Sequence, residues 1–513
     1  MDEPMKEIPE VPAMAAEPSK PVYTYTPPPS YRFPMKKPEL IFGLLLVAFS
    51  MIMTNGALFA GANLAFAFGI LGNLLSTGGY LLAKKHRPDG YTAALLGLCI
   101  LIIAAFPRSA DAGMKTLAIL ALLTVPSLAF CLMAGQNRFP ATGITTLLDA
   151  PRVLFAMGLG RLAESARGLK DACSSSGAIG KKGSSVVLGL VIAIPLVAIL
   201  IPLLMFADAA FEGLLDLLPE IRWSEILSTL VVGLYIGWIL YSRAAALQYL
   251  PKTEAPRKNR KGLNTITVNT VLFSVSAVYV VYLLSQLAYF VGGFSGILPE
   301  GYTLSEYARR GFFEMAWLCA INLGIIALAV GLVSAQGKPP LSTRLVCLFI
   351  GGVTLFLVAT ASGKMLLYIG TYGLTRLRVL TETFMVWLGC TTVMVCIWLF
   401  RPRLPYMKVT LLLALALCAA LLWADVDTQV ARYNVDAYLS GRLETVDVHY
   451  LRYLGNGAVP QLARLEKEAP NGKIKSQANT FLKEKAKQLP DSDIRGWNYV
   501  NYIAKSYLPK TDS

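Results

Sequence analysis

The sequence predicts an all-α fold: a polytopic transmembrane helix bundle of about 11 spans, followed by a small helical extracytoplasmic C-terminal region. Three observations predict this. Hydrophobic residues make up 55% of the 513-residue chain and charged residues only 15%. The mean hydropathy is +0.53. Apolar stretches alternate with short polar connections, and Lys and Arg gather in every second connection. A water-soluble protein of this length carries more charge and shorter apolar runs.

Each apolar stretch is expected to be a helix, because a helix satisfies its own backbone hydrogen bonds where no water is present, and roughly 20 residues cross the hydrocarbon core. The division of the first two spans, at Asn55 and Gly56, is the weakest boundary, so ten or twelve spans are the alternatives. The expected spans are residues 40–54, 57–83, 91–106, 117–134, 186–206, 226–250, 267–291, 312–333, 345–361, 384–400 and 409–424.

Positive residues predict the orientation of these spans. One set of connections, which includes the N-terminal arm, contains 25 Lys and Arg residues, and the alternate set contains 8. Short cytoplasmic loops retain Lys and Arg, so we expect a cytoplasmic N-terminus and an extracytoplasmic C-terminus. The net charge of +15 then lies beside anionic lipid headgroups, and we expect the bilayer as a partner and no nucleic acid.

The chain divides into five regions. Residues 1–38 form a Pro-rich cytoplasmic arm that we expect to be disordered, and 39–134 contain the first group of transmembrane helices. Residues 135–185 are a cytoplasmic loop, 186–424 the transmembrane core, and 425–513 a helical extracytoplasmic tail. The outer tail and the Pro-rich arm are the two candidate segments for contact with protein partners, and for the arm a plain solvated tether is the favoured interpretation.

The cytoplasmic loop contains an amphipathic helix pattern. Leu148, Phe155, Leu162 and Leu169 recur every seven residues, with charged residues opposite them. This pattern is typical of a helix that lies in the membrane interface with its apolar face down. A helix packed beneath the bundle is the alternative.

Cysteine and histidine usage argues against metal and disulfide chemistry. Seven of the eight cysteines lie in expected spans, with only Cys173 in a loop, and the outer tail has none. The chain has no CxxC motif, and its two histidines are His86 and His449. We therefore expect no metal site and no cofactor.

Two polar groups in the second half of the chain are the candidate functional residues, because ionisable side chains in or against spans are costly. Both groups show helical spacing and fall on the expected outer side, so we expect them to meet. A structural ion-pair network is the first interpretation, a site for an anionic ligand held by arginines is the second, and catalysis is the third. The candidates are Glu306, Arg309, Arg310 and Glu314 in the first group, and Lys364, Tyr368, Tyr372, Arg376, Arg378 and Glu382 in the second.

These same stretches carry a resemblance to known sequences. The segments LPEGYTLSEYARRGFFEMAWLCAINL and KMLLYIGTYGLTRLRVLTETFMVWL, with ARYNVDAYL and HYLRYLGNGAVPQL further on, resemble bacterial multipass membrane-protein families of unknown function numbered 4153 and 4173. The resemblance covers residues 267–462. It implies a bacterial cytoplasmic-membrane protein whose characteristic motifs are the two polar groups, and it implies no particular activity.

The sequence favours a non-enzymatic membrane protein: a scaffold, sensor or assembly partner. A transporter or channel for an anion or proton is the first alternative. An extracytoplasmic-face enzyme acting on a lipid-linked phosphate substrate is the second. Arginines beside a carboxylate lower its pKa and make it a poor base near neutrality, which counts against the enzyme. Gly233 and Gly237 are spaced for close helix contact, either within one chain or between chains.

Overall fold

The computed structural model describes residues 31, 33–174, 223–252, 262–294, 312–333, 339–488 and 493–509, with a few isolated positions between 189 and 207. All regular structure in these ranges is helical. Three sequence predictions lie outside the described residues: the Pro-rich arm up to residue 30, nearly all of the expected span 186–206, and the stretch that contains Glu306, Arg309 and Arg310.

Within the described ranges, nine helices are long and apolar enough to cross a membrane. A tenth apolar helix, α3 (Gly90–Ala105), is shorter. Large apolar side chains such as Leu44, Trp317 and Leu328 are exposed along these helices, which is expected where lipid is the solvent. The prediction of an all-α integral membrane protein is therefore confirmed. The nine long helices are α1 (Lys37–Phe59), α2 (Leu64–Ala83), α4 (Ala112–Met133), α9 (Trp223–Tyr249), α10 (Thr265–Phe294), α12 (Phe312–Val333), α13 (Leu341–Tyr372), α14 (Arg376–Phe400) and α15 (Tyr406–Ala424).

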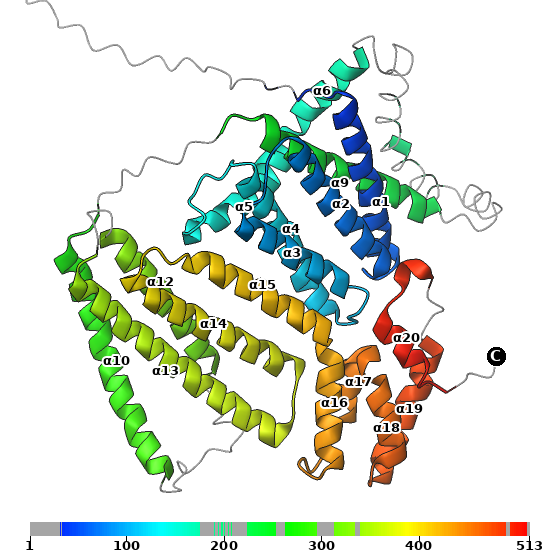
Figure 1. Ribbon diagram of the computed structural model, residues 1–513. Helices are drawn as coiled ribbons and strands as arrows, with labels where there is room; N and C mark the ends of the chain where they lie inside the picture. Colours follow the sequence, from blue (N-terminus) through cyan, green and yellow to red (C-terminus); the bar gives the residue numbers. More distant parts are fainter. Residues whose placement is uncertain are drawn as a thin grey trace, which may run out of the picture.

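The helices form two groups joined by α15 (Figure 1). In the first group, α1, α2, α3, α4 and α9 share one apolar core. In the second, α10, α12, α13 and α14 share two smaller cores. Helix α15 contacts α3 on one side and α14 on the other, and its Leu415 and Leu422 are buried in the core of the first group. The two groups therefore lie side by side with α15 between them.

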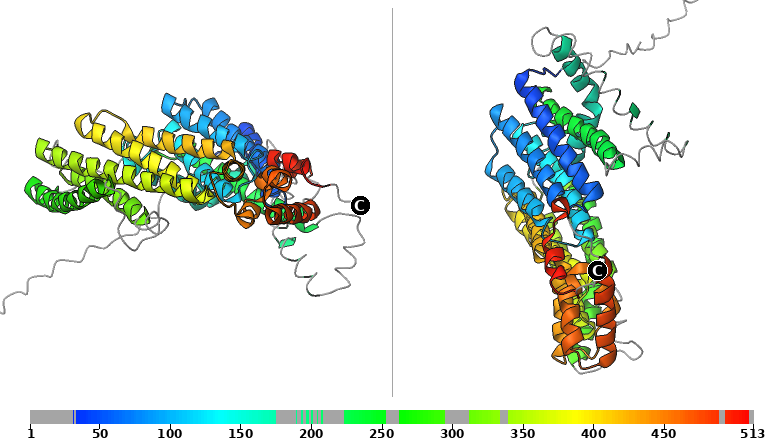
Figure 2. Two further views of the ribbon diagram at one scale, coloured as in Figure 1. Left: turned by 90° about the horizontal axis from the view of Figure 1, so that it is seen from below. Right: turned by 90° about the vertical axis from the view of Figure 1, so that its right-hand side faces the viewer.

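A C-terminal module of short helices follows α15 directly. Its elements are α16 (Val426–Leu439), α17 (Val448–Tyr453), η5 (Gly455–Ala458), α18 (Val459–Glu468), α19 (Gly472–Gln488), η6 (Ile494–Gly496) and α20 (Tyr499–Lys505). The module has a hydrophobic core of its own, which includes Val430, Leu451, Leu462 and Phe481. It lies at one end of the helix bundle (Figure 2), which we call the module end; the opposite end is the far end.

Local sequence signals set the helix boundaries at the module end. The Asp111 carboxylate accepts hydrogen bonds from the backbone N–H groups of Gly113 and Met114, at 2.8 and 3.1 Å, and so caps the start of α4. Thr375 caps the start of α14. Asp425 adopts a left-handed conformation, φ +49°, between α15 and α16, and this turn directs the chain from the bundle into the module.

A second helical segment lies at the far end. It consists of η1 (Ile144–Leu148), α5 (Asp149–Pro151), η2 (Arg152–Gly158), η3 (Leu159–Arg161) and α6 (Leu162–Ser174). Val153 and Met157 of this segment are buried in the core of the first group, whereas Leu148 and Phe155 are exposed. The segment therefore packs on the bundle with one face and presents apolar side chains on another.

Gly233 and Gly237 lie in the contact between α9 and α1. A Cβ atom at Gly237 would lie 2.7 Å from the Cα of Val47, and one at Gly233 would lie 2.7 Å from the Cα of Met51. Real Cβ atoms do not approach a backbone so closely, so only glycine allows this helix spacing. The small-residue pair therefore serves packing within the chain.

We expect Gly237→Leu to lower the free energy of unfolding by about 1–3 kcal/mol, because the new side chain forces α9 away from α1. Thermal melting of the purified protein in detergent measures the effect. Gly97→Leu is the matched control, since Gly97 is exposed and a Cβ atom there meets nothing within 4 Å. Equal melting temperatures for the two variants would contradict the packing role of Gly237.

Candidate functional site

The polar residues of the module end converge on Arg376, the first residue of α14. Its guanidinium donates two hydrogen bonds to the Asp427 carboxylate, from Nε to Oδ1 at 2.8 Å and from Nη2 to Oδ2 at 2.6 Å. The Nε atom also lies 3.2 Å from Oδ2 of Asp111. Both carboxylates are buried and the Arg376 side chain is 23% exposed. One guanidinium thus joins α4, α14 and α16.

A second part of the site lies beside this ion pair. Asp425 accepts hydrogen bonds from the Ser109 hydroxyl and the Ala110 N–H, both at 3.2 Å, and from the Thr428 hydroxyl. These bonds tie the turn before α16 to the connection between α3 and α4. The connection and the module are therefore held at the same point of the bundle.

Lys115 adds a second buried cation, and it donates a hydrogen bond to the amide oxygen of Asn63. Asn498, from the returning end of the module, donates to the same oxygen at 3.1 Å and to the Ser109 carbonyl at 2.8 Å. Buried polar groups in apolar surroundings need such partners, because each unsatisfied one costs about 1–3 kcal/mol. We call these eight residues the docking network: Asn63, Ser109, Asp111, Lys115, Arg376, Asp425, Asp427 and Asn498.

The docking network contains three carboxylates and two cations, so its charges do not cancel when all are ionised. Burial raises the pKa of Asp427 to about 6, with Asp111 and Asp425 adding to the increase and Arg376 opposing it. Asp111 lies at the N-terminus of α4, where the helix dipole stabilises a negative charge. Asp427 therefore takes up a proton at mildly acidic pH.

Three further contacts attach the module to the bundle. The Asn434 side chain accepts from the Leu374 N–H at 2.7 Å and donates to the Leu374 carbonyl at 2.8 Å, which clamps the turn between α13 and α14 onto α16. Arg495 forms an ion pair with Glu225 of α9 at 2.5 Å. The Tyr499 N–H donates to the Pro107 carbonyl at 2.7 Å. The module thus contacts both helix groups.

Aromatic and basic side chains surround these attachment points. Arg108 lies over the Trp423 ring at 5.7 Å and over the Tyr499 ring at 5.3 Å, and its Nε donates to the Trp423 carbonyl at 2.8 Å. Trp and Tyr at helix ends are typical of the boundary between lipid and water. Arg108 therefore links Trp423 at the end of α15 to Tyr499 at the start of α20.

The predicted site residues are spread over several environments. Arg378 lies 4.1 Å from the centre of the Tyr368 ring and donates to the carbonyls of Tyr372 and Gly373, and the rings of Tyr368 and Tyr372 are 4.9 Å apart. These three residues form a cation–π cluster next to the docking network. Lys364 and Glu382 are partly buried on α13 and α14, and Glu314 is exposed at the start of α12. The meeting of Glu306, Arg309 and Arg310 with the second group lies outside the described residues.

The partners of Arg376 were missed by the sequence reasoning, which expected them among the acids of the first polar group, Glu306 and Glu314. They are Asp111, which is 265 positions earlier, and Asp427, which follows the last span. Two signals were available. Asp111 is placed to cap an apolar helix, and the sequence Ala424-Asp425-Val426-Asp427 puts two acids at the exit of α15. Neither signal identifies Arg376 as the partner, because only the fold brings Arg376, Asp111 and Asp427 together.

A family model described as a domain of unknown function, DUF4153, matches residues 90–465. The chain belongs to this family. Comparisons with curated proteins and with solved structures found no match. The DUF4153 region runs from α3 to α18, so it contains Asp111, Lys115, Arg376, Asp425 and Asp427. Asn63 and Asn498 of the docking network lie outside it, as does the Arg495 ion pair.

We expect Arg376→Gln to lower the free energy of unfolding of this DUF4153 protein by about 2–4 kcal/mol, because two buried carboxylates lose their cation. The partial exposure of Arg376 places the effect below that of a fully buried pair. Thermal melting measures it, and adding Asp427→Asn should recover part of the loss. The control is Arg432→Gln, since Arg432 is 67% exposed and pairs with Asp436 at 3.8 Å. A wild-type melting temperature for Arg376→Gln would refute the docking role.

Asp427 makes stability depend on pH. Its pKa in the folded protein, about 6, lies above the value of about 3.8 expected when unfolded, so the folded state holds the proton more tightly. The contribution of Asp427 to stability therefore falls as pH rises from about 4 to about 6, by up to about 3 kcal/mol, and then stays level.

In Asp427→Asn this pH-dependent loss should be absent, and the melting curves of the variant and the wild type should diverge between pH 4 and 6. Melting temperatures measured in steps of half a pH unit test this. Glu444→Gln, an exposed change on the same module, serves as control. Parallel pH profiles for wild type and Asp427→Asn would show that Asp427 does not titrate in this range.

Proposed function

We propose that this protein is a non-enzymatic membrane scaffold that holds its C-terminal module rigidly at the extracytoplasmic surface, where the module docks a protein partner. The observation that carries the proposal is the engagement of Arg376 by both Asp111 and Asp427. These three charged side chains of the module end pair with one another and so attach the module to the bundle. Transport or catalysis would instead need such groups to face a substrate.

The attachments support rigidity. Three separate segments of the bundle hold the module: the connection between α3 and α4, the turn between α13 and α14, and the start of α9. Bonds to points so far apart resist rocking of the module about any one of them. A sensor or hinge would be expected to have one attachment and a freely rotating body.

The exposed surface of the module supports a partner. Tyr453 is 71% exposed and Tyr502 is 64% exposed, and Ile494 and Tyr507 are also exposed. Tyr is enriched at protein interfaces, because its ring provides contact area with little loss of conformational freedom. These side chains belong to the module and not to the apolar faces of the spans.

The distribution of positive residues supports the orientation. Lys36, Lys37, Lys84, Lys85 and Arg87 border helices at the far end, together with Arg401 and Arg403. Under the positive-inside bias the far end faces the cytoplasm and the module lies outside. We further propose that the membrane is the bacterial cytoplasmic membrane and that anionic headgroups contact the basic far end.

Site-directed cross-linking tests both the side and the partner. A membrane-impermeant maleimide with a benzophenone group is added to intact cells that express Tyr502→Cys, and the cells are then irradiated. We expect a cross-link to one protein of reproducible mass, because Tyr502 is exposed on the outer module. Lys85→Cys, at the far end, should not react, and Leu328→Cys, exposed on a span, should give no such cross-link.

Reaction of Lys85→Cys without reaction of Tyr502→Cys would reverse the orientation. Reaction of Tyr502→Cys and of a second position, Tyr453→Cys, with no cross-linked protein from either would reject partner docking by the module.

A further inference from the structure

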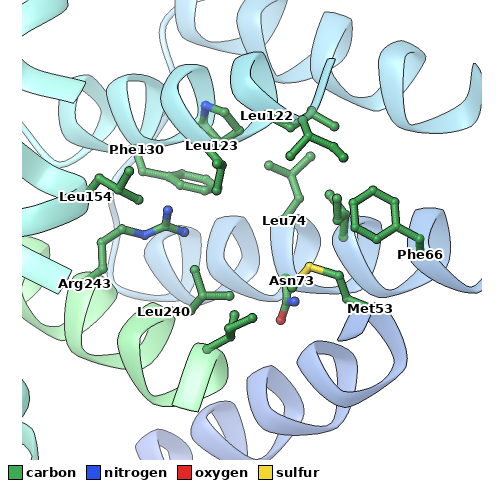
Figure 3. A pocket seen from close by; sticks show the side chains of 14 residues that line it. Met53, Phe66, Asn73, Leu74, Leu122, Leu123, Phe130, Leu154, Leu240 and Arg243 are labelled. Atoms are coloured by element: carbon green, nitrogen blue, oxygen red, sulfur yellow. The ribbon is translucent and has the colours of Figure 1, made fainter. Parts of the chain in front are cut away.

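A cavity of about 180 Å³ lies within the first helix group, between α1, α2, α4, α9 and η2 (Figure 3). Its wall is apolar, with side chains such as Phe66, Leu74 and Leu122, except for Asn73 and Arg243. Asn73 already donates a hydrogen bond to the hydroxyl of Ser50 at 3.2 Å. Arg243 is therefore the polar group of the wall that remains to be explained.

Arg243 is a buried cation with little compensation. Its side chain leaves α9 and its guanidinium points into the cavity beside Phe130 (Figure 3). The residue is 7% exposed; Nη1 donates to the Ser127 hydroxyl at 3.0 Å, and the Phe130 ring lies 5.9 Å away. Its Nε has no hydrogen-bond partner, and no acidic side chain in the described part of the chain forms an ion pair with it.

The depth of Arg243 makes this arrangement costly. It lies six residues before the end of α9, which is about 9 Å along the helix axis. A charge at such depth normally pairs with another group or marks a functional site. The docking network follows this rule, because each of its cations has an anionic or amide partner. Within the described residues Arg243 has only a hydroxyl and an aromatic ring, and an anion is the missing partner.

The shape of the cavity identifies what carries the anion. Its wall on α4 extends from Ile119 to Phe130, about 16 Å along the helix, so the cavity is long and apolar. A dry cavity of about 150 Å³ is large enough to bind benzene, so this one accommodates part of an alkyl chain. Leu123 in its wall is 46% exposed, which opens the cavity toward the bilayer. A hydrated inorganic anion would find no partners along such a wall.

We propose that this cavity binds an acidic lipid of the bilayer, with its anionic group on Arg243 and an acyl chain along α4. The chain extends from Arg243 toward the module end, which is the direction in which tails of the far-end leaflet run. The recognised chemistry is a phosphate or carboxylate joined to an alkyl chain. This site is independent of the docking network and of the scaffold role.

Photolabelling in lipid nanodiscs tests the proposal with the full chain. The nanodiscs consist of dioleoylphosphatidylcholine with a trace of phosphatidylglycerol that carries a diazirine in one acyl chain. A parallel sample contains phosphatidylcholine with the same photoreactive chain. After irradiation, mass spectrometry maps the labelled peptides. We expect the acidic lipid to label the peptides around Ile119–Phe130 and Ile236–Arg243 at least about tenfold more than the neutral lipid. Both lipids carry a phosphate, but the choline cation of phosphatidylcholine cancels the net negative charge that would compensate Arg243.

Arg243→Gln should reduce labelling by phosphatidylglycerol to the level of phosphatidylcholine. The matched control is Arg344→Gln, since Arg344 also lies near the far end and packs 5.9 Å from a phenylalanine ring, Phe400, but on α13 outside the cavity. Leu123→Trp provides a second test, because Leu123 faces the bilayer and the larger ring obstructs the opening; it should reduce labelling by both lipids.

Competition separates the sources of the anionic group. Oleate and dioleoylphosphatidylglycerol should both compete with the label, whereas oleyl alcohol, which has the same chain without the charge, should not. Stronger competition by oleate than by dioleoylphosphatidylglycerol at the same concentration would identify a free fatty acid as the preferred acidic lipid. Equal labelling by the two photoreactive lipids, equal competition by oleyl alcohol, or unchanged labelling in Arg243→Gln would each overturn the proposal. If Arg243→Gln does not accumulate, unchanged labelling in Leu123→Trp overturns it.

Discussion

The contact of Arg376 with Asp111 and Asp427 is the constraint on which the arrangement of the two halves depends. Arg376 begins α14 in the second helix group, Asp111 begins α4 in the first, and Asp427 begins the module. A bidentate guanidinium pair is directional, so it sets the relative position of these three helix ends more narrowly than apolar contact does. Removing Arg376 leaves two buried carboxylates without their shared cation, which makes the three elements dependent on one another.

Apolar packing explains the rest of the bundle. Helix α15 lies between the two groups, with Leu415 and Leu422 buried in the core of the first, and the glycines of α9 allow α1 to approach at backbone distance. In lipid such contacts depend on close fit, because an exposed leucine is as well solvated by acyl chains as by another leucine. Polar contacts at the module end therefore position the module and the helix ends, whereas close apolar packing holds the spans together.

The two unusual cations of the first helix group differ in what surrounds them. Lys115 lies near Asp111 and Asp425 and donates to Asn63, so its burial is compensated within the chain. Arg243 lies in an apolar wall that opens toward lipid, and the described chain provides it with a hydroxyl and a ring. Docking of the module explains the burial of Lys115. The proposed lipid ligand explains the burial of Arg243, because the membrane is the nearest source of an anionic group.

The sequence by itself determined the all-α membrane fold, because apolar runs of this length have few other stable structures in water or in lipid. The apolar runs placed the starts of three spans at residues 91, 117 and 384, whereas α3, α4 and α14 begin at Gly90, Ala112 and Arg376, directly after capping side chains that an apolar run does not include. The sequence drew attention to Arg376 and Arg378 through the helical spacing of the polar group to which they belong. The partners of Arg376, the role of Gly237 against Val47, and the cavity around Arg243 were decided only by the tertiary structure. Each of these depends on residues that are far apart in the chain, and helical periodicity reports which face a residue occupies but not which face of another helix it meets.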